Sequence, residues 1–166
     1  MRSTISLTRG GFGNGDLCRS ARLVARYRDS VITEETSEMG HQVKAKCREC
    51  GSTFTVDHGG GFIFHLVRCE NCGKTKSIGF DELGELHQRH LKGLPGPYCV
   101  ASAEHDKDIR EHAQVEPISE DEYHRRIEAI AGTCRCGGSY CLDASARCPK
   151  CRSTRIDEGE ITVMHD

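Results

Sequence analysis

The sequence predicts a small α+β fold stabilised by bound metal, with two β-hairpin modules joined by a helical segment. Three observations support this prediction: closely spaced cysteine pairs occur in two regions, short β-like runs flank these pairs, and helix signals fall between the two regions. The chain has 166 residues, of which only 5% are aromatic, and it has no Trp. Because this composition offers little material for one large core, we expect an additional source of stability.

The first cysteine region contains the pattern C-x-x-C-G twice. A tetrahedral zinc site needs two turns held at Zn–S distances of about 2.3 Å. We expect the runs 52–56 and 62–67 to form a hairpin that brings the two turns together, with strand 42–46 before it and a third strand over 74–80. One Zn²⁺ is therefore predicted to be bound by Cys47, Cys50, Cys69 and Cys72.

The second cysteine region repeats this arrangement near the C-terminus. A strand over 139–143 and a turn over 144–147 separate its two cysteine turns, and a further strand is expected over 153–163. Cys141 is an alternative ligand, although strand geometry should point it away from the metal. A second Zn²⁺ is predicted to be bound by Cys134, Cys136, Cys148 and Cys151. Disulfides within such closely spaced pairs would close strained, very small loops.

Helix signals fill the segment between the two regions. Asp81 can cap a helix that ends at Gly93, and the charged stretch 102–112 can form a second helix. Ser119-Glu-Asp-Glu122 is a capping box that opens a third helix, which Gly132 closes. On this third helix the apolar face is predicted to contain Tyr123, Ile127 and Ile130. We expect His87 and His90 to be solvated or to cap their helix, and Cys99 to be a small buried residue.

These signals divide the chain into four parts. The division comprises a disordered tail over 1–38, a first metal module over 39–80, a helical segment over 81–131 and a second metal module over 132–166. Met39 is expected to be the translation start, and Cys18 is expected to be a free thiol.

Charge is distributed unevenly along the chain. Residues 41–79 carry six Lys/Arg against three Asp/Glu, residues 80–131 carry six against twelve, and residues 132–152 carry four against one. A zinc ion with four thiolates adds a charge of about −2, so each module falls from +3 to about +1. Much of the basic charge is therefore expected to offset the thiolates.

The cysteine patterns of 47–80 and 134–156 resemble the zinc-ribbon superfamily, a β-hairpin fold built on two cysteine turns. The overall order resembles small bacterial proteins with a ribbon at each end of a helical segment. The second ribbon is also similar to the zinc domain of nickel metallochaperones for hydrogenase maturation. Those chaperones carry a Met-His-Glu nickel site, from which Met39-Gly40-His41 departs.

The leading functional hypothesis is a non-catalytic adaptor that recognises another protein through its ribbons. Nucleic acid is the less favoured partner, because nucleic-acid-binding domains are usually strongly basic. Candidate contact residues in the first ribbon are Lys44, Lys46, Arg48, Arg68, Lys74 and Lys76, with Phe54, Phe62 and Phe64 as stacking groups. The alternative is a metal-handling protein with a labile additional site that uses Cys99 or Cys141.

Catalysis and membrane insertion lack support in the sequence. A catalytic zinc keeps an open coordination position, whereas both predicted sites offer four thiolates, and no carboxylate pair or phosphate-binding loop accompanies them. No apolar run approaches the length of about 18 residues that a membrane span needs. Since zinc ligands require reduced cysteines, we expect a cytoplasmic location.

Overall fold

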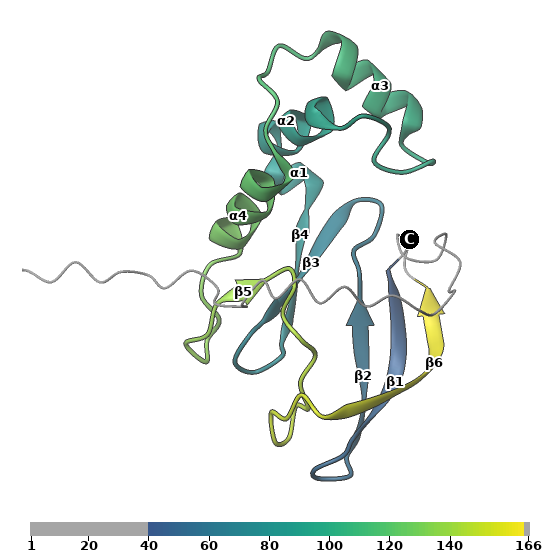
Figure 1. The fold of residues 1–166 in the computed structure, drawn as a ribbon, viewed down its shortest axis with the longest axis vertical. Helices are drawn as coiled ribbons and strands as arrows, with labels where there is room; N and C mark the ends of the chain where they lie inside the picture. Colours follow the sequence, from purple (N-terminus) through teal and green to yellow (C-terminus); the bar gives the residue numbers. More distant parts are fainter. Residues whose placement is uncertain (1–39, 165–166) are drawn as a thin grey trace, which may run out of the picture.

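The computed structural model describes residues 40–164, so the predicted tail, Cys18 and Met39 lie outside the described residues. Strands form two antiparallel sheets in this part of the chain, and the helices gather at one end (Figure 1). The elements in chain order are β1 (His41–Cys47), β2 (Thr53–His58), β3 (Phe64–Cys69), β4 (Thr75–Gly79), α1 (Phe80–Leu83), α2 (Glu85–Gly93), α3 (Ala103–His112), α4 (Glu120–Ala131), β5 (Tyr140–Cys141) and β6 (Ile156–Met164).

The first sheet has the strand order β2-β1-β6. Strand β1 alternates as a half-buried strand should, with Val43, Ala45 and Cys47 facing inward. It pairs with β2 across a tight turn, from His41 opposite His58 to Lys46 opposite Thr53. On its other side β1 pairs with β6, so the strands nearest the two ends of the described chain are neighbours.

The second sheet has the strand order β4-β3-β5. Strand β3 pairs with β4 from Phe64 opposite Gly79 to Arg68 opposite Thr75, and it pairs with the two-residue strand β5 on its other side. Strands β2 and β3 therefore belong to different sheets, and the predicted hairpin of 52–56 with 62–67 is wrong. The physical reason is that each cysteine turn reverses the chain itself, so the strands that flank one turn pair with each other.

The two sheets are nested along the chain. The first sheet takes β1 and β2 before the second sheet begins, and β6 after the second sheet has ended. The helices lie in turn between β4 and β5 of the second sheet. Each sheet thus contains strands from both predicted metal modules. The predicted helical segment remains continuous and lies between these modules in the sequence.

Arg68 joins the two sheets. Arg68 is only 9% exposed. Its guanidinium donates to the backbone oxygen of Asp57 in β2 and to that of Ala144 after β5. Burial lowers the pKa of Arg68, and the nearby carboxylates of Glu158 and Asp57 oppose this effect. Arg68 is therefore a buried link between sheets, which removes it from the predicted surface contacts.

The helical segment follows its sequence signals closely. The Ser119 hydroxyl accepts the Glu122 N–H at the start of α4, and Gly132 ends the helix with φ 73°. Tyr123 and Ile127 are buried as predicted, but Ile130 is 46% exposed and Ala131 is buried in its place. The helix predicted from Asp81 to Gly93 is divided at Gly84 into α1 and α2.

The larger apolar core lies between the second sheet and the helices. It comprises the buried residues Val67, Ile78, Leu83, Tyr123, Ile127 and Ala131. The first sheet has a smaller core of Val43, Ala45, Val56 and Ala146. Both cores are small, which agrees with the shortage of apolar material in the sequence. Among residues 40–164, no helix is both long and apolar enough to span a bilayer.

Three histidines surround the buried hydroxyl of Tyr123. His65 Nε2 lies 2.8 Å from this hydroxyl and His87 Nδ1 lies 2.6 Å from it. The ring of His90 stacks on the ring of Tyr123, with centroids 3.9 Å apart. Since a hydroxyl has one proton to donate and can accept two hydrogen bonds, at most one of the first two imidazoles accepts from it, and the tautomers decide which. The expected solvent exposure of His87 and His90 is wrong, because both are buried.

This histidine cluster predicts a loss of stability in acid. Burial lowers the pKa of His65 to about 3 and that of His87 to about 4, both below the ordinary value of 6.5. Their stabilising contribution is therefore complete above pH 6.5 and is lost as the pH falls from 6.5 towards 4. Each proton taken up on unfolding adds a slope of at most about 1.4 kcal/mol per pH unit.

The measurement is the free energy of unfolding in denaturant between pH 7.5 and 5, for the wild type and for His65→Gln. The variant should show a shallower pH dependence, because it has lost one of the titrating groups. His112→Gln is the matched control, since the His112 side chain is 71% exposed on α3 and lies outside the histidine cluster. Parallel pH profiles for the wild type and His65→Gln would contradict the prediction. Acid release of metal affects all three proteins alike.

Candidate metal centres

The cysteine turns share one backbone geometry. In each C-x-x-C turn, the N–H of the first cysteine donates to the carbonyl of the residue five positions later. The carbonyl of the same cysteine accepts the N–H of the residue four positions later. These distances are 2.9 and 3.0 Å at Cys47, 2.8 and 2.9 Å at Cys69, and 2.9 and 2.8 Å at Cys148. In the shorter turn at Cys134, each of these two hydrogen bonds spans one residue fewer. Four similar turns therefore present their thiols at the ends of hairpins and loops.

A left-handed residue follows the second cysteine of every turn. This position has a φ between 63° and 85° in Gly51, Gly73, Gly137 and Arg152. Glycine adopts this conformation without the steric cost that a side chain brings. The three glycines therefore suit these turns, and Arg152 takes the same conformation at a cost.

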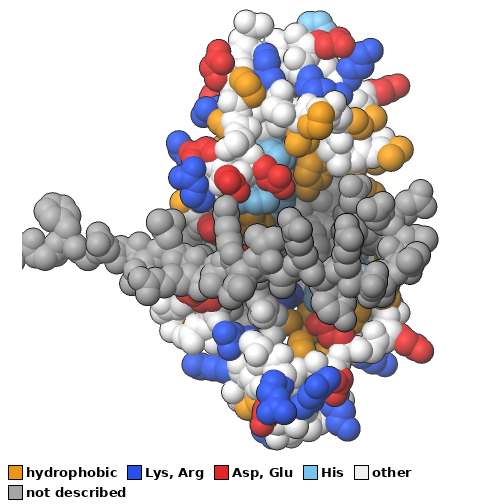
Figure 2. Space-filling model, in the orientation of Figure 1, with side chains coloured by type: hydrophobic (Ala, Val, Ile, Leu, Met, Phe, Trp, Pro, Cys, Tyr) orange, Lys and Arg blue, Asp and Glu red, His pale blue; other side chains and the backbone are white. Residues whose placement is uncertain are grey.

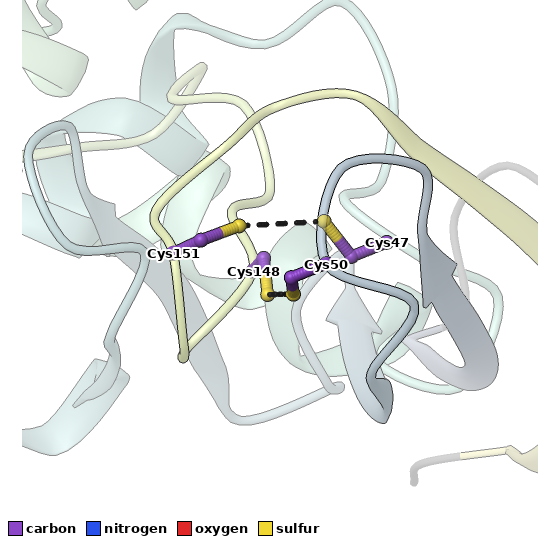
Figure 3. A group of neighbouring side chains, drawn as sticks. All are labelled: Cys47, Cys50, Cys148 and Cys151. Atoms are coloured by element: carbon purple, nitrogen blue, oxygen red, sulfur yellow. Dashed lines mark hydrogen bonds between the residues drawn. The ribbon is translucent and has the colours of Figure 1, made fainter.

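Cys47 and Cys50 from the β1–β2 turn meet Cys148 and Cys151 from the loop before β6 (Figure 3). The sulfur of Cys47 lies 3.5 Å from that of Cys151, and the sulfur of Cys50 lies 3.6 Å from that of Cys148. In Figure 3 the four side chains point into the same space from two separate chain segments. We call this group the outer cluster.

Cys69 and Cys72 from the β3–β4 turn meet Cys134 and Cys136 from the loop after α4. The sulfur of Cys69 lies 3.4 Å from that of Cys136, and the sulfur of Cys72 lies 3.7 Å from that of Cys134. We call this group the inner cluster. In both clusters all four sulfurs lie within 4.8 Å of one another, and the pairs are too far apart for a disulfide of about 2.05 Å.

All eight predicted ligands therefore gather into two groups of four, but with different partners from those predicted. The sequence pairing placed Cys47 and Cys50 with Cys69 and Cys72, and this pairing is wrong. Each cluster instead combines one turn from the N-terminal half with one from the C-terminal half. A signal for this was present, because strands were expected on both sides of the first turn. A cysteine turn within its own hairpin supplies only two ligands, so the other two must come from a turn elsewhere in the chain.

Hydrogen bonds lower the pKa of two thiols in each cluster, Cys50 and Cys148 in the outer cluster and Cys134 and Cys136 in the inner cluster. The Cys136 N–H and then the Tyr140 hydroxyl lower the pKa of Cys134 to about 6. In the outer cluster the Ser52 hydroxyl lowers the pKa of Cys148 to about 6. Burial has the opposite effect on Cys69 and raises its pKa to about 12. Because metals bind thiolates, the donors at Cys134 and Cys148 prepare each cluster for a cation.

The sequence reasoning missed these supporting donors. The Ser52 hydroxyl lies 2.8 Å from the sulfur of Cys50 and 3.4 Å from that of Cys148, so one side chain serves both halves of the outer cluster. In the inner cluster Asn71 Nδ2 lies 3.8 Å from the sulfur of Cys136. Such residues orient ligands and tune their basicity. A polar residue inside or just after a cysteine turn is the signal that could have identified them.

The remaining cysteines of the described chain stay outside both clusters. Cys99 is buried as predicted, with its sulfur 3.1 Å from the Ser102 hydroxyl. Cys141 is fully buried and lies away from the tetrathiol groups, near the carboxylates of Glu128 and Asp143. One oxygen of Glu128 accepts the Leu142 N–H at 3.1 Å. Cys141 is disulfide-bonded, so this third group offers two carboxylates and no free thiol.

The left-handed positions make a paired prediction about stability. An added Cβ at Gly51 meets no atom within 4 Å, so Gly51→Ala should cost about 1–2 kcal/mol through backbone strain alone. Arg152→Gly should have the opposite sign, because glycine relieves the strain at φ 63°. Chemical denaturation of both metal-loaded variants checks this. A destabilised Arg152→Gly would mean that its side chain makes a stabilising contact that outweighs the strain.

The comparisons with known proteins bear on the same segment of the chain. No match was found among curated proteins or among solved structures. One family model, described as a domain of unknown function (DUF8255), matches residues 43–157. The match begins in β1, ends at the start of β6 and contains all eight clustered cysteines, so the family unit includes both clusters and the whole second sheet. Because the match covers more than half of the chain, the protein belongs to the DUF8255 family.

Proposed function

We propose that this protein is a zinc-binding, non-catalytic adaptor that recognises another protein, with two Zn²⁺ ions as structural elements. The observation that carries the proposal is the pair of tetrathiol clusters, each joining distant parts of the chain. Cys50 and Cys148 are 98 residues apart, and Cys69 and Cys136 are 67 apart. An ion in each cluster would hold together segments that the small apolar cores hold only weakly.

The sulfur geometry suits zinc. A tetrahedral site with Zn–S distances of about 2.3 Å has sulfurs about 3.8 Å apart. The sulfur separations of 3.4–3.7 Å in the clusters are slightly shorter, so a small adjustment would accommodate the ion. Tetrahedral thiolate sites also bind iron, and metal analysis separates the two. Thiolate ligands require a reducing compartment, which supports a cytoplasmic location.

Four thiolates around each ion support a structural role. A catalytic zinc binds three protein ligands and keeps a position for water or substrate, whereas four cysteines fill a tetrahedral shell. The donors around the sulfurs are Ser52, Asn71, the Tyr140 hydroxyl and backbone N–H groups, none of which acts as a general base at neutral pH. We therefore assign both ions to folding rather than to a reaction.

Surface charge favours a protein partner over nucleic acid. On the face shown in Figure 2, Lys and Arg side chains lie at both ends of the molecule, including the end opposite the helices. Near the outer cluster, Arg48 pairs with Asp157 and Arg155 pairs with Glu49. The exposed cations Lys150 and Arg152 are then balanced by the charge of about −2 of a zinc tetrathiolate. This surface therefore carries little net positive charge for a phosphate backbone.

Two of the candidate contact residues also have internal roles. Arg68 is the buried link between the sheets, and Lys76 donates to the Ala131 carbonyl at the end of α4. Lys44 and Lys46 remain exposed on the first sheet, and Arg48 and Lys74 remain exposed at the cysteine turns. Fewer of the six candidate Lys and Arg residues are therefore available for contact than the sequence predicted, which weakens the case for nucleic acid.

Metal handling is the second candidate function. The proximity of Glu128, Cys141 and Asp143, whose ligand atoms lie within 4.8 Å of one another, favours it, but the disulfide bond of Cys141 leaves no thiolate for a metal. The bond from the Leu142 N–H to Glu128 and the full burial of Cys141 count against an exchangeable site. A third, weaker metal equivalent that disappears in Asp143→Asn would favour metal handling over the adaptor.

Native mass spectrometry of protein purified under reducing conditions tests the proposal. We expect two zinc ions per chain, and chelation should unfold both sheets because metal binding and folding are coupled. The double variant Cys50→Ser/Cys148→Ser removes two ligands of the outer cluster and should lose one zinc. The matched variant Cys50→Ser/Cys69→Ser removes one ligand from each cluster and should weaken both sites.

The two double variants also distinguish the possible pairings. If the four cysteines of each half bound one ion, Cys50→Ser/Cys148→Ser would damage both sites and Cys50→Ser/Cys69→Ser would damage one. That reversed result would contradict the clusters described above. Retention of both sheets in metal-free protein, measured by circular dichroism and amide exchange, would contradict the structural role of zinc.

A further inference from the structure

A cavity of about 430 Å³ lies at the helical end of the molecule, away from both cysteine clusters. It is bounded by the loop after β2, by α1 and α2, and by α3 with the segment before it. Its lining residues include the aromatic side chains Phe62, Phe80 and Tyr98, and the apolar side chains Ile63 and Leu91. A volume of this size is within the range of ordinary ligand sites.

The aromatic walls meet at right angles. The rings of Phe80 and Tyr98 have centroids 5.4 Å apart and planes at 90°. His87, which also lines the cavity, stacks on Phe80 with centroids 4.0 Å apart. Burial lowers the pKa of His87 to about 4, so its imidazole is neutral at pH 7 and does not repel a cation. Perpendicular aromatic walls with a neutral neighbour are suited to cation–π contact.

A buried carboxylate completes one wall of the cavity. Asp106 is only 1% exposed, and its Oδ2 accepts the Tyr98 N–H and the Ser102 hydroxyl, both at 2.7 Å. Its Oδ1 lies 3.6 Å from Nδ1 of His105, which is beyond hydrogen-bonding distance. This second oxygen therefore retains acceptor capacity within the lining of the cavity.

The charge of the lining is one-sided. Asp81 and Asp106 are carboxylates, and none of the lining residues is Lys or Arg. At the rim, Ile63 is 70% exposed, which gives a partner an apolar surface to cover. On the face shown in Figure 2, hydrophobic side chains gather over this helical half of the molecule. Negative charge, aromatic walls and an apolar rim together select a cationic side chain on an apolar stem.

We propose that this cavity binds a lysine or arginine side chain of a partner protein, with the stem against Phe62 and Leu91 and the cationic head between the aromatic rings and Asp106. The proposal rests on the adaptor function above and assigns that function its recognition site. The site lies on the helices and not on the metal-binding turns, where the sequence had placed the partner.

The test uses the full-length, zinc-loaded protein labelled with ¹⁵N. It is titrated with the methylamides of Nα-acetyl-lysine, Nα-acetyl-arginine and Nα-acetyl-norleucine, and amide shifts are followed by NMR. The lysine or arginine compound should produce saturable shifts confined to residues that line the cavity. The neutral norleucine compound should bind about tenfold more weakly, because it lacks the charge that Asp106 and the aromatic rings recognise.

Three variants make the result specific. Asp106→Asn keeps an acceptor for Tyr98 and Ser102 but removes the charge, and it should weaken cation binding about tenfold. Asp108→Asn is the matched control, since Asp108 is 73% exposed on the same helix and should leave binding unchanged. Gln88→Lys adds a cation to the lining without altering the bonds of Asp106, and it should also weaken binding.

The outcomes separate this inference from the adaptor function. Equal binding of norleucine, an equal effect of Asp106→Asn and Asp108→Asn, or no saturable shift at the cavity would overturn the cationic site. Each of these results would leave a two-zinc protein intact, so the adaptor proposal would stand. Absence of bound zinc in the purified protein would instead count against the adaptor proposal, whatever the titration showed.

Discussion

Closure of each sulfur cluster across two distant chain segments is the constraint on which the rest of the structure depends. Sheet pairing between β1 and β6, and between β3 and β5, joins residues more than 60 positions apart. The apolar cores beneath these sheets contain six and four buried residues. Cores of this size compensate poorly for the conformational entropy lost on folding, so the clusters have to supply long-range order.

Nesting reduces the entropic cost of that closure. The cost of closing a flexible loop rises with the logarithm of its length, by about 0.6 kcal/mol for each doubling. Once the inner cluster has closed the segment between Cys69 and Cys136, the outer cluster spans a much shorter effective loop between Cys50 and Cys148.

The sequence predicted local features well and long-range ones poorly. The cysteine turns, the Ser119 cap and the burial of Tyr123 and Ile127 depend on residues within one turn or one helix, and all agree with the structure. The partners of Cys47 and Cys69 depend on which hairpin approaches which, and no local spacing encodes this choice. His87 and His90 were misjudged for a similar reason, because the hydroxyl and the ring that accompany them come from α4. The cavity is formed by three separate segments and had no signature of its own.

The pairing of His41 with Met164 places the two ends of the described chain at the same corner of the first sheet. Any segment that precedes β1 and any segment that follows β6 therefore leave the molecule side by side. A pulling force applied through both ends would peel β1 from β6 one residue pair at a time, starting at this corner. The tear would travel along β1 to Cys47, where the outer cluster joins the strand to the loop before β6. Four metal–sulfur bonds would bear the force at that point, so the ion would act as a mechanical stop that protects the second sheet and the helices.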